Sequence, residues 1–163
     1  MDPIKKLGLL CLGSRLKRLG ERLQQGVQEV IDAYDLPVAA HHYPLMQHLS
    51  KVGGRSVNQL ATSLGVSQPS ITRSVGQLSQ ARLVQVRIAS ADGRQRLVSL
   101  TPAGRKLLQY SRQLIWPGVE AAVEQCCDGD GTALLKQLEF LEANLTQQKF
   151  TRRIEHLVQT ANA

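Results

Sequence analysis

The chain has 163 residues, of which 42% are hydrophobic and 20% charged, and its formal net charge is +7. This is typical of one soluble globular domain whose core is large enough to fold without disulfides or a structural metal. The three cysteines, Cys11, Cys126 and Cys127, are odd in number and two are adjacent, which argues against a disulfide framework and indicates a reducing cytoplasm.

The positive charge is concentrated in the central third of the chain. From Arg55 to Lys106 the sequence has eight basic residues and one acidic residue, a net charge of +7, whereas the remainder has twelve of each kind. This distribution is expected of a polyanion-binding module held between structural arms. A solvated basic face without a partner is the alternative.

The N-terminal segment does not fit a signal peptide. Its apolar run, Leu7 to Leu12, is only six residues long and is followed by Arg15, Lys17 and Arg18 without a small-residue cleavage site. No stretch approaches the ~20 apolar residues of a membrane span. We therefore expect a cytoplasmic protein without a membrane partner.

Two helices are predicted before residue 53. Apolar residues recur every three or four positions from Leu9 to Val30, which predicts a long amphipathic helix that ends near Tyr34. A second helix is predicted from about Ala40 to Val52, with Leu45, Met46 and Leu49 inward.

A helix-turn-helix pattern follows. Ser56 and Gln59 form a capping box, and Gly65 suits a tight turn. Ser67 can cap a second helix with Pro69 in its first turn and with Ile71, Val75 and Leu78 inward. Two short helices joined by a turn of about three residues are typical of a helix-turn-helix.

A hairpin and further helices complete the chain. Apolar and polar residues alternate at 84–88 and 97–100, which predicts two strands. The residues from Ser90 to Gly93 are typical of the turn of a hairpin. Thr101 and Pro102 begin a predicted helix that runs to about Cys126 with a bend at Pro117–Gly118. After a turn at residues 126–132, a last helix is predicted from Thr132 to about Val158.

This order of elements closely resembles the MarR (multiple-antibiotic-resistance regulator) family. Two stretches carry the resemblance: the recognition segment Leu64–Arg73 with Val75, Leu78 and Leu83–Val84, and the wing with Asp92, Arg94, Val98, Leu100, Thr101 and Gly104. Together they cover about residues 40 to 106.

The resemblance implies a mainly α fold, a winged helix-turn-helix with a small β-hairpin wing. Long N- and C-terminal helices would form a dimerisation region. The implied division is 1–35 for the N-terminal dimerisation helix, 36–105 for the DNA-binding region and 106–163 for the C-terminal dimerisation helices, in one compact chain.

The candidate DNA contacts lie on the recognition helix and the wing. Helix-turn-helix proteins place the start of this helix in the major groove, where arginine bonds guanine and glutamine bonds adenine. The resemblance implies that Arg94 enters the minor groove and that Asp92 orients it. Capping alone also explains Ser67, and a plain hairpin turn explains Asp92. The candidates are Ser67, Gln68, Ser70, Thr72, Arg73, Gln77, Arg87, Asp92, Arg94 and Arg96.

The chain departs from the family pattern at two places in the recognition helix. Relatives usually have glycine at its end, where this chain has Arg82, which argues against a left-handed C-cap but adds a phosphate contact. Gly76 lies inside the helix at a cost of roughly 1 kcal/mol relative to alanine.

No metal, cofactor or enzyme is predicted. His41 and His42 are adjacent and point to different sides of a helix, and the acidic run 126–132 lacks the glutamate of a calcium loop. A phosphate loop, an H-E-x-x-H pair and a nucleophile elbow are absent from the sequence. Arg15, His42, Tyr43 and Trp116 are candidates for binding a small aromatic or lipophilic effector, and ordinary core packing is the alternative for each.

The predicted function is that of a homodimeric transcription regulator. It would bind a pseudo-palindromic duplex operator and act as a repressor that a small-molecule effector releases. The alternative is a winged-helix module that binds an acidic protein partner.

Overall fold

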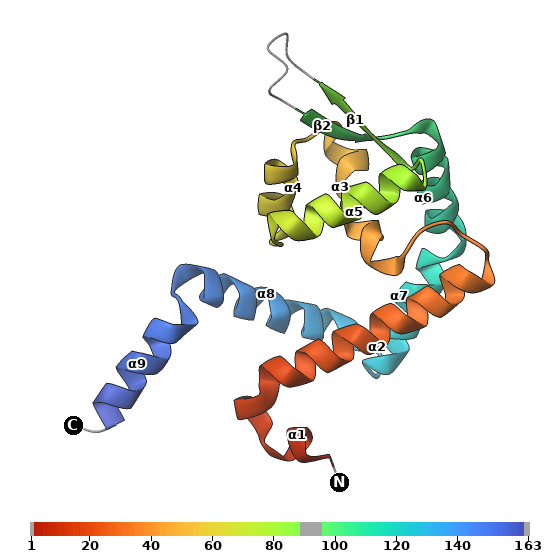
Figure 1. Ribbon diagram of the computed structural model, residues 1–163. Helices are drawn as coiled ribbons and strands as arrows, with labels where there is room; N and C mark the ends of the chain where they lie inside the picture. The colour runs from red at the N-terminus through yellow and green to blue at the C-terminus, as the bar shows by residue number, and fades with distance from the viewer. Residues whose placement is uncertain (1, 89–95, 162–163) are drawn as a thin grey trace. The chain divides into compact units, whose positions relative to one another are not determined.

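A computed structural model of the chain describes residues 2–88 and 96–161. The chain divides into two compact units, Met1–Trp116 and Pro117–Ala163, which are described separately. The fold is mainly helical with one two-stranded hairpin, as predicted (Figure 1). Within the two described ranges, no helix is long and apolar enough to cross a membrane.

The first unit contains ten elements. They are α1 (Pro3–Lys6), η1 (Gly8–Cys11), α2 (Leu12–Ala33), η2 (Ala40–His42), α3 (Tyr43–Val52), α4 (Val57–Leu64), α5 (Gln68–Gln80), β1 (Val84–Ile88), β2 (Arg96–Leu100) and α6 (Pro102–Leu114). The helix α7 (Trp116–Cys126) begins at the boundary, and α8 (Gly131–Gln147) and α9 (Phe150–Ala161) follow in the second unit.

The N-terminal helix α2 begins later than predicted. A single helix from Leu9 was expected, but a 3-10 turn precedes Leu12, and Gly8 and Gly13 are weak helix formers at this point. The far end of α2 is anchored to the winged helix, because Ile31 is fully buried in its core and Gln28 Oε1 accepts a 2.8 Å hydrogen bond from the Ala40 amide. The last turns of α2 therefore belong to the same core as α3.

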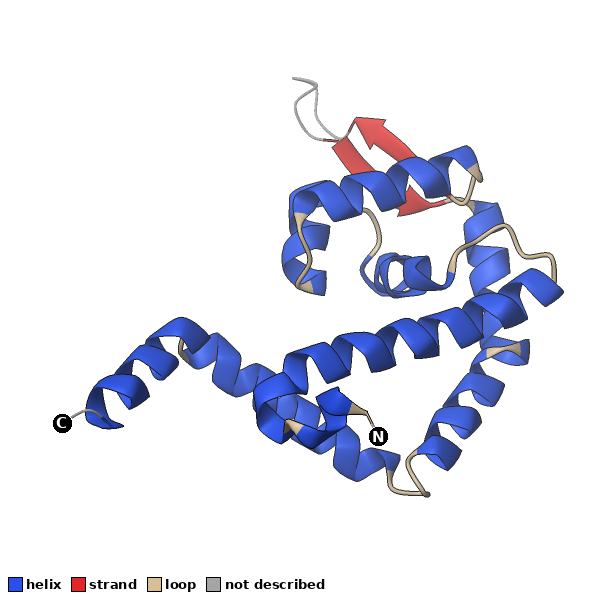
Figure 2. Ribbon diagram, turned by 60° about the horizontal axis from the view of Figure 1, so that its bottom comes forward, coloured by secondary structure: helices blue, strands red, loops and turns tan. Residues whose placement is uncertain are grey.

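The helix-turn-helix agrees closely with the prediction. The capping box is complete, since the Gln59 amide donates to Ser56 Oγ and the Ser56 amide donates to Gln59 Oε1. The turn passes through Gly65, whose φ of 64° is a left-handed conformation that glycine adopts without strain. Figure 2 shows α4 and α5 meeting at this turn. Residues Ile71, Val75 and Leu78 of α5 are buried, as predicted.

The recognition helix ends in a left-handed turn, so the prediction at Arg82 was wrong. Arg82 has a φ of 58°, and the hydrogen bonds from the Arg82 amide to Ser79 O and from the Leu83 amide to Leu78 O form a Schellman motif. A non-glycine residue in this conformation costs roughly 1–2 kcal/mol. The motif satisfies the end carbonyls of α5 in spite of that cost.

The hairpin strands pair antiparallel, with Val84 opposite Leu100 and Val86 opposite Val98. Strand β2 begins at Arg96, one residue earlier than predicted. The Arg55 amide and carbonyl both bond to Val98, at 3.0 and 2.8 Å, so the segment before α4 extends the hairpin by one bridge. The predicted turn at residues 90–93 lies outside the described residues.

A compact junction joins α5, the hairpin and α6. The Leu83 carbonyl accepts a hydrogen bond from the Thr101 amide at 3.0 Å. The Thr101 hydroxyl donates to the Arg82 carbonyl at 2.7 Å and lies 3.2 Å from the Leu83 carbonyl. Thr101 Oγ1 in turn accepts from the Gly104 amide at 3.0 Å and caps α6, as predicted. Gly104 is buried so tightly that an added Cβ would lie 2.0 Å from Leu83 O.

The C-terminal helices are shorter than predicted. The expected helix through residue 126 is two helices, with the break at Ile115 rather than a bend at 117–118, because Pro117 lacks an amide and its ring disfavours a helical residue before it. The expected helix 132–158 is also two, since Gln148 is extended (φ −141°, ψ 130°). The turn between α7 and α8 is confirmed, with left-handed Asp128 and Gly129.

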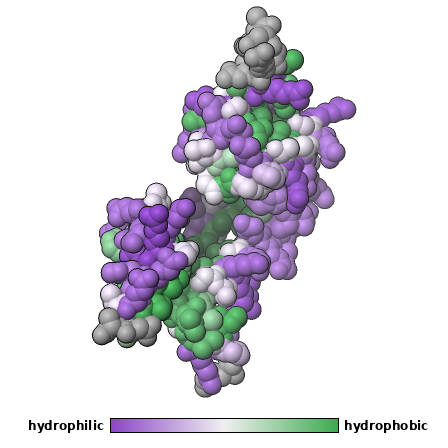
Figure 3. Space-filling view, turned by 60° about the vertical axis from the view of Figure 1, so that its left-hand side comes forward, coloured by the Kyte–Doolittle hydropathy of each residue, from purple (hydrophilic) through white to green (hydrophobic). Residues whose placement is uncertain are grey.

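The second unit buries almost none of its own apolar side chains. Gly131 is its one buried residue among those described, and Phe140 is 70% exposed. Apolar side chains of the first unit are also exposed near the chain's start, with Leu9 at 87%. In Figure 3, hydrophobic residues lie at the surface next to both ends of the chain. Such exposed apolar surface is typical of a region that binds another protein surface.

We predict that Gly104→Ala destabilises the protein by several kcal/mol, because the added methyl group meets the Leu83 carbonyl. The matched control is Gly76→Ala in α5, where nothing lies within 4 Å of the added Cβ. We expect this control to raise the free energy of unfolding by about 0.5–1 kcal/mol. Urea denaturation of both variants measures the two changes, and equal effects would contradict the close packing at Gly104.

Candidate nucleic-acid interface

The recognition helix α5 presents a polar face at its N-terminal half. The predicted contacts Gln68, Ser70, Thr72 and Arg73 are all exposed, while the apolar side of the helix is buried in the core. This division follows from the 3.6-residue helical period, since Ile71, Val75 and Leu78 fix the inward side. Residues that share the outward side can reach a ligand together.

The N-terminus of α5 is open to solvent. Ser67 is exposed and its hydroxyl accepts a long hydrogen bond, 3.4 Å, from the Ser70 amide. The Ile71 amide bonds to the Ser67 carbonyl at 3.2 Å, and Pro69 has no amide proton to leave unpaired. The partial positive charge of the helix end suits an anion.

Gln77 differs from the other predicted contacts because its side chain bonds to the protein interior. Its Oε1 accepts a 3.1 Å hydrogen bond from Nε2 of His42, which is 96% buried. This bond uses one of the two lone pairs of the oxygen that a bidentate contact with adenine requires, and it orients the side chain toward His42. The structure therefore links the recognition helix to the start of α3, a link that the sequence pattern did not indicate.

His42 is a buried histidine with one unpartnered nitrogen, Nδ1, among the described residues. Burial lowers the pKa of His42, and the charge of His41 beside it lowers the pKa further. The hydrogen bond to Gln77 opposes this shift but is the smallest of the three effects, so the surroundings favour the neutral ring with its proton on Nε2.

The hairpin contributes two further predicted contacts. Arg87 and Arg96 are exposed on β1 and β2, and Arg87 bonds to the Gln85 side chain at 3.3 Å. Asp92 and Arg94 lie outside the described residues, so their roles stay predictions from the family resemblance. Arg55, which the sequence analysis counted only as charge, is held beside Val98 at the base of the hairpin.

The positive charge of this region is not neutralised by ion pairs. Within residues 2–88 and 96–161 the two ion pairs are Lys17–Glu21 and Arg18–Asp2, both in the N-terminal segment. Arg73, Arg87 and Arg96 therefore have no carboxylate partner among the described residues. Unpaired guanidinium groups on an exposed face attract phosphate groups.

The predicted effector residues fall into two places. Tyr43 and Trp116 pack edge to face with ring centroids 5.9 Å apart, and the buried Tyr43 hydroxyl lies 2.6 Å from Ser111 Oγ. Burial raises the pKa of Tyr43. Arg15 is exposed on α2, 13 residues before Gln28, which corresponds to about 20 Å along the helix. The single chain therefore brings His42, Tyr43 and Trp116 to one region and leaves Arg15 apart.

The sequence of the winged-helix region matches a known family. A sequence model described as the MarR family matches residues 34–95. No protein of curated function matches the chain.

Solved structures of three regulators share the fold. A mutant of MarR from E. coli in complex with operator DNA is 19% identical, with a TM-score of 0.71 over 89% of this chain and 99% of its own. The transcriptional repressor CouR, bound to a 23-mer DNA duplex, is 23% identical, with a TM-score of 0.69 over 80% and 92%. BpsR of Bordetella bronchiseptica, whose DNA binding is regulated by 6-hydroxynicotinic acid, is 22% identical, with a TM-score of 0.64 over 80% and 92%. At these identities the likeness establishes the fold.

We predict that the free energy of unfolding decreases as the pH is lowered below about 6.5, and that His42 causes part of this decrease. The folded protein resists protonation of His42, whereas the unfolded chain accepts the proton, so stability is fully present above the ordinary pKa and declines below it. One such proton contributes at most about 1.4 kcal/mol per pH unit.

Urea denaturation between pH 7.5 and 5 measures this slope. His42→Asn should reduce the slope, while His156→Asn, an exposed position in α9, should leave it unchanged. An unaltered slope in His42→Asn would rule out this contribution.

Proposed function

We propose that the protein is a dimeric, sequence-specific DNA-binding transcription regulator of the MarR family, because a sequence model of that family matches its winged-helix region. It acts as a repressor that a small-molecule effector releases, and it works by binding rather than by catalysis. Its place of action is the cytoplasm.

One observation carries the proposal: a helix-turn-helix presents the polar face of α5 beside an arginine-bearing hairpin, and no acid within residues 2–88 and 96–161 pairs with these arginines. Base edges in the major groove would be read by Arg73 and its neighbours Gln68, Ser70 and Thr72. Arg87 and Arg96 would meet backbone phosphates, as would the helix end at Ser67. Arg94, oriented by Asp92, would enter the minor groove.

A second copy of the chain is the proposed partner of the exposed apolar surfaces. In α9 the side chains Phe150, Ile154, Leu157 and Val158 recur at helical spacing and are all about half exposed or more. In α2, Leu16, Leu19 and Leu23 form a similar exposed row. Burial of these rows in a symmetric dimer would place two recognition helices about 34 Å apart, one turn of duplex DNA.

The effector is proposed to act through the region of His42, Tyr43 and Trp116. The His42–Gln77 hydrogen bond supports this, because a change at the start of α3 alters a partner of the recognition helix directly. Arg15 stays a candidate on the dimerisation helix. A ligand that binds more tightly to a geometry unsuited to DNA would shift the population away from the DNA complex.

We predict that Arg73→Ala weakens binding to a selected duplex by about 1–3 kcal/mol, roughly 5- to 150-fold, and relaxes the sequence preference at one position. Selection of bound fragments from a random duplex pool supplies the target, and fluorescence anisotropy over a range of salt measures the affinity. Arg96→Ala should weaken binding to all duplexes alike and reduce the salt slope by about 1.

Lys17→Ala is the control, since Lys17 is a highly exposed cation on α2. Its affinity and salt slope should equal those of the unmodified protein. A flat salt response, or equal losses in all three variants, would overturn the DNA-binding proposal.

We predict that Leu157→Asp raises the dimer dissociation constant at least about tenfold, because a charge enters a desolvated apolar surface. Sedimentation equilibrium of the full chain measures it. Gln159→Asp on the same helix adds a negative charge at an exposed polar position and should leave the dimer intact. A monomer in the unmodified protein would refute the dimer.

A further inference from the structure

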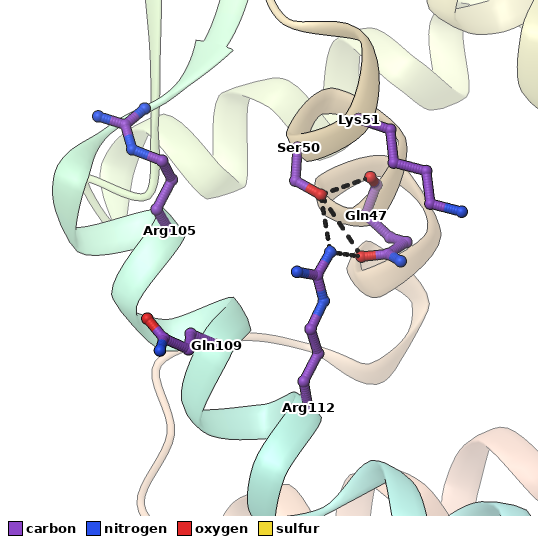
Figure 4. A pocket seen from close by; sticks show the side chains of 6 residues that line it. All are labelled: Gln47, Ser50, Lys51, Arg105, Gln109 and Arg112. Carbon is purple, nitrogen blue, oxygen red and sulfur yellow. Dashed lines mark hydrogen bonds between the residues drawn. The ribbon is translucent and has the colours of Figure 1, made fainter.

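A polar pocket of about 620 Å³ lies between α3 and α6 in the first unit (Figure 4). Three of its six lining residues are cationic, and no acid is among the six. The lining residues are Gln47, Ser50, Lys51, Arg105, Gln109 and Arg112.

Arg112 is held in a fixed place by neutral partners. It extends from α6 toward α3, where its Nη2 donates to Ser50 Oγ at 2.9 Å and to Gln47 Oε1. Its guanidinium carbon also lies 5.6 Å from the centroid of the Trp116 ring. These contacts restrict the side chain without cancelling its charge, and they leave its remaining N–H groups for a ligand.

The other two cations stand at the rim of the pocket. Arg105 donates from Nη1 to the Leu100 carbonyl at 2.8 Å, again a neutral partner. Lys51 extends from the last turn of α3. Its amine makes no hydrogen bond or ion pair with the described residues. Figure 4 shows Arg105 and Lys51 on opposite sides of Arg112, with their charged ends directed outward. An anion beside Arg112 would be attracted by all three cations.

We propose that this pocket binds a small phosphate-bearing ligand. Phosphate offers several acceptor oxygens, which match the free N–H groups of the Arg112 guanidinium, and Lys51 and Gln109 lie at opposite edges of the same pocket. The volume lies within the range of small-molecule sites, about 300–1,000 Å³. The site is distinct from the polar face of α5, and its existence does not depend on the proposed DNA binding.

Inorganic pyrophosphate is the probe for this site. Titration of the full chain at constant ionic strength, balanced with sodium chloride, should give saturable binding heat and a saturable rise in melting temperature. Lys51→Gln should weaken the apparent affinity about tenfold, which corresponds to about 1.4 kcal/mol. Arg112→Lys keeps the charge but removes the guanidinium fork, so it should also weaken binding.

Lys106→Gln is the matched control, since it removes one cation from the same helix as Arg105 but does not line the pocket. It should bind pyrophosphate like the unmodified protein. Equal losses in Lys51→Gln and Lys106→Gln, or no saturable response in the unmodified protein, would overturn the proposal.

A duplex-DNA titration in phosphate-free buffer separates a free ligand from the DNA backbone. Unchanged DNA affinity in Lys51→Gln, together with weaker pyrophosphate binding, supports a free phosphate ligand. Weaker DNA binding in Lys51→Gln without any pyrophosphate binding would assign the pocket to the DNA backbone and overturn the proposal. If the unmodified protein bound pyrophosphate but no DNA, the DNA-binding function would fail while the pocket would stand.

Discussion

The arrangement of α5, the hairpin and α6 depends on the carbonyl group of Leu83. It accepts a hydrogen bond from the Thr101 amide and is approached closely by Gly104, while the Leu83 amide closes the end of α5. One residue thus connects the end of the recognition helix, the start and end of the hairpin, and the start of α6. The spacing between the polar face of α5 and the arginines of the hairpin follows from this junction.

The protein leaves two physical requirements unmet within a single chain. Its central arginines carry charge that no described acid neutralises, and its terminal helices expose leucine and phenylalanine side chains to water. The first requirement is met by an anion and the second by another apolar surface. The proposed DNA and second copy of the chain would satisfy the two together, since a dimer would also place two polar faces on one duplex.

The sequence predicted those parts of the fold that depend on neighbouring residues. The capping box at Ser56, the cap at Thr101 and the buried face of α5 follow from local rules and were confirmed. The break at Ile115 was predicted two residues too late, as a bend at residues 117–118. The break at Gln148 was missed, because helical periodicity continues across it and no proline or glycine lies beside it. The His42–Gln77 bond joins residues 35 positions apart, and the pocket joins two helices, so neither has a local signal.

Arg82 carries a trade-off between folding and attraction to anions. Its backbone has a left-handed conformation that glycine adopts with the least strain, yet its side chain adds a cation where the recognition helix meets the hairpin. Replacement by glycine would relax the backbone and remove the cation in one step. At this position a substitution that raises the stability of the fold therefore lowers the local positive charge, and a residue that keeps the charge keeps the backbone strain.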